Sequence, residues 1–179
     1  MGKTLRVVGM DPSLRNWGIA KGILNLDTSE VKIQELIVIN PVLPTGKQVR
    51  QNSLDLTSAQ QLANYAIAAA KEAQAIFVEV PMGSQSARAM ASYGICVGVL
   101  GALRASGIPF FEVTPTEVKM ASVGSKVATK EAMINWARQT HPEAGWPKAA
   151  AKAEHMADAT AAIHAGLRTN EFKQLIQFL

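Results

Sequence analysis

The stretch LRVVGMDPS at residues 5–13, followed by WGIAKGIL at residues 17–24, decides the fold. The first run is apolar and rich in β-branched side chains, and it ends at Asp11 before a turn containing Pro12. Two such runs joined by a short turn predict a β-hairpin. Asp11 then lies at the end of a buried strand, although an aspartate before a proline is also typical of an ordinary turn.

A second acidic residue interrupts an apolar strand in the middle of the chain. Residues 75–80 read AIFVEV, a buried-strand pattern that contains Glu79. A carboxylate in such a run costs several kcal/mol unless it is paired or bound to a cation. The pattern therefore indicates either a partner for Glu79 or an edge strand that leaves it half exposed.

The third group of polar residues lies near the end of the chain, in the alanine-rich helix predicted for residues 149–167. His155 and Asp158 are three positions apart and so share one face of that helix. They are consistent with a solvated helix face. If the fold brings them to Asp11 and Glu79, the four groups instead predict a divalent-metal site and a metal-dependent phosphodiesterase.

The length and order of the patterns predict one α/β domain over residues 1–179. Three strands to about residue 39 precede a helix near 54–73, a fourth strand, a helix from 86 to about 105 and a fifth strand at 109–113. This order predicts a mixed five-stranded sheet with helices on both faces. Residues 169–179 form an amphipathic C-terminal tail that docks either on its own domain or on a partner.

Four stretches resemble the RuvC-like Holliday junction resolvases of the ribonuclease H-like superfamily, which include phage-encoded members. The matching stretches are GMDPSLRNWGIA at 9–20, IFVEVP at 76–81, VTPTEVKMASVGSKVATKEAM at 113–133 and EHMADATAAI at 154–163. The resemblance extends to about residue 167 and implies a ribonuclease H-like fold. It also implies a nuclease that cuts four-way junctions or related branched DNA and leaves 5′-phosphate and 3′-hydroxyl ends.

By this resemblance, Asp11 is the first-strand carboxylate that bridges two metal ions, Glu79 the fourth-strand carboxylate and Asp158 the final acid. His155 stands where other members have Asp or His, and Glu154 is a competing ligand. The implied cofactor is two Mg²⁺ ions per site, and the imidazole favours Mn²⁺ as an alternative. Lys119 and Lys130 resemble two functional lysines that stabilise charge on the phosphate.

The charge distribution agrees with a nucleic-acid partner. The net charge is +4 and the pI about 9.3, and residues 114–152 carry most of the basic excess. Many basic proteins bind no nucleic acid, so this support is weak. The residues expected to contact DNA are Arg15, Ser84, Gln85, Ser86, Arg88, Lys119, Lys126 and Lys130.

A stripe of small residues in the predicted 86–105 helix includes Gly94, Gly98 and Gly101. The resolvases are homodimers that pair through the corresponding region, so the stripe is either a dimer face or a close contact with the domain's own sheet. A dimer suits a four-way junction, which has two-fold symmetry.

Other observations bear on substrate and compartment. Where many resolvases carry an aromatic residue after the fourth-strand acid, this chain has Pro81, Met82 and Gly83. The alternatives are a ribonuclease H-like enzyme acting on RNA or RNA–DNA hybrid, and a branched-DNA-binding module that does not cut; an ATPase is disfavoured because no Gly-rich phosphate loop is present. The single cysteine, Cys96, and the lack of a signal sequence or membrane span predict a cytoplasmic protein of a bacterial or phage-infected cell.

Overall fold

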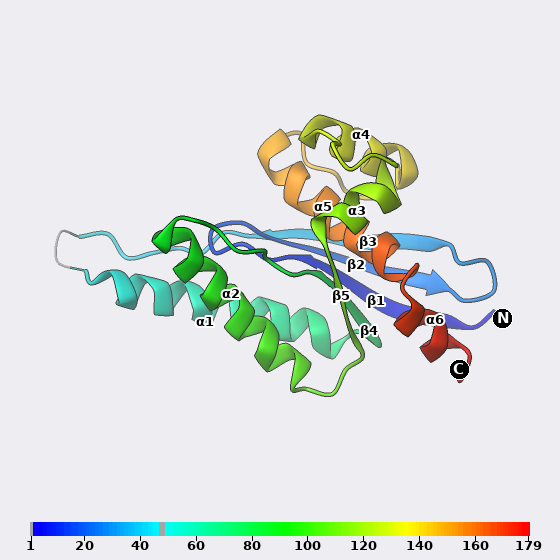
Figure 1. Ribbon diagram of the computed structural model, residues 1–179, viewed down its shortest axis with the longest axis horizontal. Helices are drawn as coiled ribbons and strands as arrows, with labels where there is room; N and C mark the ends of the chain where they lie inside the picture. The colour runs from blue at the N-terminus through cyan, green and yellow to red at the C-terminus, as the bar shows by residue number, and fades with distance from the viewer. Residues whose placement is uncertain (1, 47–48) are drawn as a thin grey trace.

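The computed structural model describes residues 2–46 and 49–179 and contains the predicted five-stranded mixed sheet, in the order β3-β2-β1-β4-β5 (Figure 1). The hairpin strands β1 and β2 and the following β3 are antiparallel, whereas β4 and β5 run parallel to β1. The strands are β1 (Thr4–Asp11), β2 (Trp17–Asn25), β3 (Val31–Ile39), β4 (Ala75–Glu79) and β5 (Phe110–Val113). The three N-terminal strands and the β5 prediction are confirmed.

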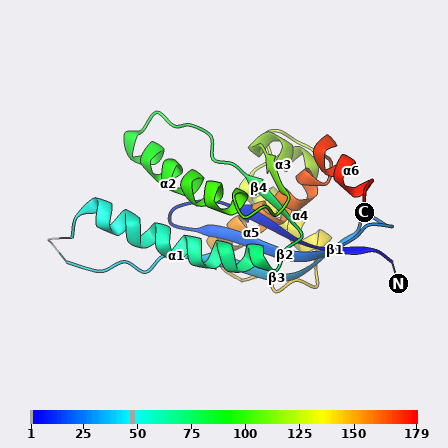
Figure 2. The same cartoon turned by 90° about the horizontal axis from the view of Figure 1, so that it is seen from below.

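Helices cover both faces of this sheet, as predicted. Helices α1 (Gln51–Lys71) and α2 (Ala87–Arg104) lie on one face, and α3 (Pro115–Ser122), α4 (Lys130–Thr140) and α5 (Ala150–Gly166) lie on the other (Figures 1 and 2). Because side chains alternate along a strand, each face has its own core. Met10 and Val78 pack against the α1–α2 side, and Val7 and Phe77 against the α5 side.

Helix α5 lies unusually close to the sheet because glycines face it. A Cβ added to Gly9 would overlap the carbonyl oxygen of Ala159, and one added to Gly18 would overlap that of His155. The alanine-rich sequence of α5 supplies the complementary flat surface, with ten of its residues buried. The missing side chains of β1 and β2 therefore set the position of α5.

The C-terminal tail docks on its own domain. It forms α6 (Asn170–Ile176), whose Phe172 is 2% exposed. The Phe172 ring centroid lies 5.2 Å from that of Phe77 and 5.3 Å from that of Phe111. Of the two expectations for the tail, the structure therefore selects packing against the domain.

The helix predicted to begin near residue 54 begins at Gln51, because the polar residues before Leu54 continue the helical turn instead of the connection. Among the described helices, none combines the length and the apolar character required to cross a membrane.

Candidate active site

Asp11 and Glu79 are the last residues of two neighbouring parallel strands. Met10 of β1 is in register with Val78 of β4, so the two acids follow at the same edge of the sheet. By the alternation of side chains, they emerge on the face occupied by α5. Both are only partly exposed.

Helix α5 brings His155 and Asp158 to the same edge. Gly18, the cross-strand partner of Asp11, lies against the backbone of His155. The His155 Nδ1 atom is 2.7 Å from Oδ2 of Asp11, a hydrogen bond between residues 144 positions apart in the chain. The predicted convergence of the first strand with the late helix is thus present in the structure.

The negative charge of Asp11 affects the pKa of the two remaining acids, Glu79 and Asp158. Burial, followed by the negative charges of Asp11 and Asp158, raises the pKa of Glu79 to about 8. Burial, followed by the charges of Asp11 and Glu154, raises the pKa of Asp158 to about 7. These shifts mean that carboxylates crowd together in a poorly solvated place, where ionisation is unfavourable without a cation.

Two lysines flank the acids. The positive charge of Lys119, on α3, opposes the upward pKa shifts of both Glu79 and Asp158. Lys130 begins α4, and its Nζ is 2.6 Å from Oε1 of Glu154. Glu154 is therefore engaged by Lys130, whereas His155 contacts Asp11.

The donor set fits hard or borderline divalent cations, which prefer carboxylate oxygens and accept imidazole. In the parts of the chain that the structure describes, no three His, Cys, Asp or Glu side chains already stand close enough to hold an ion together. The site residues converge without forming a ready-made coordination sphere. Asp11 instead shares a hydrogen bond with His155, whose pKa that hydrogen bond raises.

The other residues predicted to contact DNA are mostly at the surface. Arg15, Gln85 and Lys126 are exposed. The Ser86 side chain caps the first turn of α2, accepting from the backbone N–H of Ala89. Half-buried Ser84 accepts a hydrogen bond from the backbone N–H of Ser86.

Arg88 has a protein partner within the domain. Its guanidinium donates to both carboxylate oxygens of Asp55 on α1, at 2.6 and 2.7 Å. This fork-to-fork pair links α1 to α2 and occupies the geometry with which an arginine would hold a phosphate.

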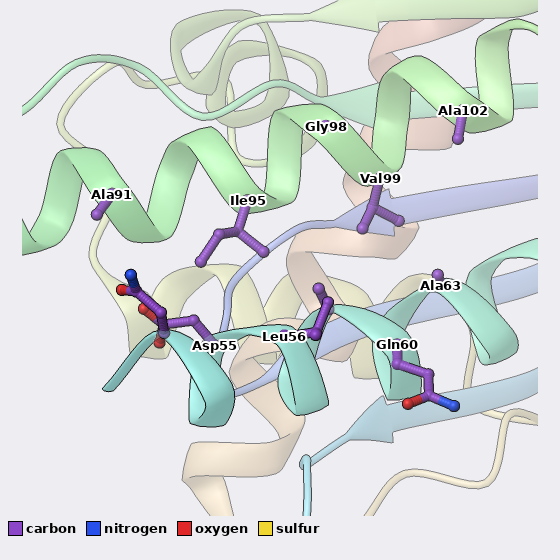
Figure 3. A pocket seen from close by; sticks show the side chains of 11 residues that line it. Asp55, Leu56, Gln60, Ala63, Ala91, Ile95, Gly98, Val99 and Ala102 are labelled. Carbon is purple, nitrogen blue, oxygen red and sulfur yellow. The ribbon is translucent and has the colours of Figure 1, made fainter. Parts of the chain in front are cut away.

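An open apolar groove separates α1 from α2 (Figure 3). Its volume is about 720 Å³, and Leu56, Ala63, Ile95, Gly98 and Val99 are among its lining residues. Gly94, Gly98 and Gly101 are exposed, and a Cβ at any of them would meet nothing within 4 Å. The interpretation of the glycine stripe as a contact with the domain's own sheet is therefore wrong.

Comparisons with solved structures identify the architecture. RuvC of Thermus thermophilus superposes with a TM-score of 0.65 at 20% identity, covering 96% of both chains. The fold is that of RuvC. The same RuvC in complex with a Holliday junction substrate gives a TM-score of 0.66 at 17% identity, over 88% of this chain and 92% of the other.

A Fowlpox virus resolvase, solved with Holliday junction DNA, shares this RuvC-like fold with a TM-score of 0.53 at 12% identity, over 96% of this chain and 99% of the resolvase. Sequence comparisons find no matching protein-family model and no matching curated protein. The likeness is therefore one of three-dimensional structure. It confirms the mixed five-stranded α/β fold predicted from the residues and the RuvC-like fold that the resemblance implies.

Sequence reasoning missed the residues that position the site. Gly9 and Gly18 fix the approach of α5, and a glycine inside a strand is a recognised signal of close backbone approach. The ion pair between Lys130 and Glu154 has no comparable signal, because its partners lie on different helices.

Proposed function

We propose that the chain is a metal-dependent, structure-selective endonuclease that cleaves Holliday junctions or related branched DNA. The observation that carries this proposal is the convergence of Asp11, Glu79, His155 and Asp158 at one edge of a RuvC-like sheet, close enough for the charge of Asp11 to raise the pKa of both Glu79 and Asp158. Such crowding has no structural merit by itself, because each buried carboxylate opposes ionisation of the next. A bound cation reverses that penalty.

Asp11, Glu79, Asp158 and His155 would hold two Mg²⁺ or Mn²⁺ ions. When bound, such ions activate a water molecule and stabilise the leaving 3′-oxygen in in-line phosphodiester hydrolysis, leaving 5′-phosphate and 3′-hydroxyl ends. The protein supplies the rest: β1 and β4 orient the carboxylates, α5 positions the imidazole, and partial burial keeps bulk water from screening them.

The two lysines have distinct settings for the same task. Lys119, near Glu79 and Asp158, is suited to stabilise charge on the scissile phosphate. Lys130 is 78% exposed and held by Glu154, so it can exchange that partner for a phosphate oxygen. Arg15, Gln85 and Lys126 are exposed for backbone contacts in the same proposal.

The proposal includes a homodimer in which the α1–α2 groove of one protomer packs against that of its partner. The groove is apolar, its glycines allow close helix approach, and Leu56 remains 70% exposed. A two-fold dimer presents two cleavage sites to a junction that has two-fold symmetry itself.

The deciding experiment incubates the protein with end-labelled four-way junction, Y-fork, linear duplex and RNA–DNA hybrid, with Mg²⁺, with Mn²⁺ and with EDTA. We expect metal-dependent nicking of the branched substrates and little cutting of linear duplex. Asp158→Asn should lower the cutting rate at least about 100-fold while junction binding persists, because the acid contacts ions and not DNA. Asp27→Asn, in the exposed turn between β2 and β3, is the matched control and should cut normally.

Each other result has a definite meaning. Preferential cleavage of the hybrid would replace the branched-DNA proposal with a ribonuclease H-like activity. Tight junction binding without cleavage under any metal would make the chain a binding module, and wild-type cleavage by Asp158→Asn would remove α5 from the catalytic site.

A further inference from the structure

Two histidines meet at the end of α5 remote from the candidate active site. His141 is the C-cap residue of α4, His164 lies in the last turn of α5, and their Nε2 atoms are 2.9 Å apart. His155 is nine positions before His164, which is roughly 14 Å along a helix. This pair is therefore separate from the acids described above.

The surroundings hold both rings in place. The Nδ1 atom of His141 is 3.7 Å from Oε1 of Glu143, and the Trp146 indole N–H donates to the His141 carbonyl oxygen at 2.8 Å. The Trp136 ring stands edge-on to the His164 ring, with centroids 5.2 Å apart. In His141 the Glu143 carboxylate lies beside Nδ1, and Nε2 faces His164. A metal-ligating histidine usually has this arrangement, with a carboxylate at the ring nitrogen that does not bind the metal.

Burial keeps these imidazoles neutral. It lowers the pKa of His141, and burial together with the nearby charges of His141 and Arg168 lowers the pKa of His164 to about 4. Neutral imidazole is the form that offers a nitrogen lone pair to a metal. The bare hydrogen bond uses only one such lone pair, since one Nε2 must donate a proton to the other.

A cleft borders the pair. Its volume is about 720 Å³, and it is lined by both histidines together with Asn25, Glu30, Thr140 and Glu143. It brings open space and two carboxylates up to the imidazole rings, although the His141 side chain is only 3% exposed. Over residues 2–46 and 49–179, however, no third acidic, histidine or cysteine side chain already completes a site.

We propose that His141 and His164 bind a divalent transition ion of the Zn²⁺ class through their Nε2 atoms, with water in the remaining positions. Binding requires that the proton on one Nε2 move to the Nδ1 of the same ring, so that both rings present lone pairs, and that the hydrogen-bonded rings part slightly to admit the ion. Two imidazole ligands favour Zn²⁺, Co²⁺ or Ni²⁺ and disfavour Mg²⁺.

The consequence of such a site is a tether between two helices. Helix α4 begins with Lys130, and α5 carries His155 and Asp158. An ion joining the other ends of these helices would hold them in register without touching the reacting groups. The site stands apart from the proposed nuclease activity and can exist whether or not that activity does.

The test uses the three histidines of the chain as reporters. Long-range ¹H–¹⁵N spectra of the full-length protein resolve the ring nitrogens, and Zn²⁺ is added in the presence of excess Mg²⁺. We expect the Nε2 resonances of His141 and His164 to shift together at one equivalent of Zn²⁺. If they stay unchanged while Zn²⁺ moves only His155, the proposal is overturned.

Variants make the same test by affinity, with Co²⁺ absorption as the readout. His164→Gln should weaken Co²⁺ binding at this site at least about 100-fold, and Glu143→Gln about 10-fold, as expected for a residue that orients a ligand. His155→Ala is the matched control and should retain the signal. Equal Co²⁺ affinity in His164→Gln and wild type would contradict the proposal, and the spectra of unaltered protein decide the matter if a variant fails to fold.

Discussion

At the scale of single residues, Glu79 opposes the stability of the domain that contains it. Burial and two neighbouring acids raise its pKa to about 8, against an ordinary value of 4.5. Between about pH 4.5 and 8 the folded, metal-free protein therefore holds a proton on Glu79 that the unfolded chain has released. With respect to Glu79, the free energy of unfolding is highest below about pH 4.5, and this stability is lost as the pH rises through about 8.

We expect Glu79→Gln to be more stable than wild type in EDTA at pH 8, by about 1–3 kcal/mol, because each pKa unit corresponds to about 1.4 kcal/mol. Thermal unfolding followed by circular dichroism measures it. Wild type should regain stability on addition of Mn²⁺, and the variant should respond weakly. A variant less stable than wild type in EDTA would show that the carboxylate is satisfied by the protein itself.

Gly18 is a second single residue that matters, because its missing side chain leaves room for the backbone of α5. An added methyl group would overlap the His155 carbonyl oxygen, so Gly18→Ala must push α5 off the sheet. We expect a loss of about 1–3 kcal/mol in unfolding free energy and a drop in cleavage larger than the stability loss explains. Gly145→Ala is the control, since a methyl group there meets nothing within 4 Å. Normal cleavage by Gly18→Ala would mean that the approach of α5 does not set the site.

At the scale of elements, sequence patterns predict what local physics determines. The run that ends at Asp11 and the strand that ends at Glu79 lie where their apolar periodicity indicates, and Ser86 precedes α2 as a cap. The partner of each element is harder to predict. That β1 lies between β2 and β4 follows from tertiary packing, and no local pattern indicates that α6 places Phe172 against Phe77.

The candidate site follows the same division. Apolar runs interrupted by acids make Asp11 and Glu79 candidates, because the cost of burying a charge is visible in sequence. The sequence alone leaves His155 and Asp158 consistent with a solvated helix face, and it is the packing of α5 that brings His155 to Asp11. The pairing of Lys130 with Glu154 and of Arg88 with Asp55 depends on side-chain geometry between helices. Hydrophobic periodicity along one helix does not predict such pairs.

At the scale of the whole molecule, helices cover one face of the sheet more completely than the other. The α5 side is closed by α3, α4 and α6, whereas the α1–α2 side ends in an apolar groove with exposed Leu56 (Figures 2 and 3). Contiguous apolar surface of this kind marks an interaction site in a protein. In the proposed homodimer a second copy would cover this surface and would bring a second candidate site to a two-fold symmetric junction.

If the proposed homodimer forms through this groove, Leu56→Glu, which places a charge in it, should give a monomer by light scattering at micromolar concentration where the wild type gives a dimer. Cleavage of a four-way junction should then yield single nicks in place of paired cuts, because each protomer keeps its own acids. Val42→Glu is the matched control: Val42 is 80% exposed against 70% for Leu56, and it lies outside the groove. A Leu56→Glu protein that remains dimeric and makes paired cuts would move the interface elsewhere, and the groove would then need a different partner.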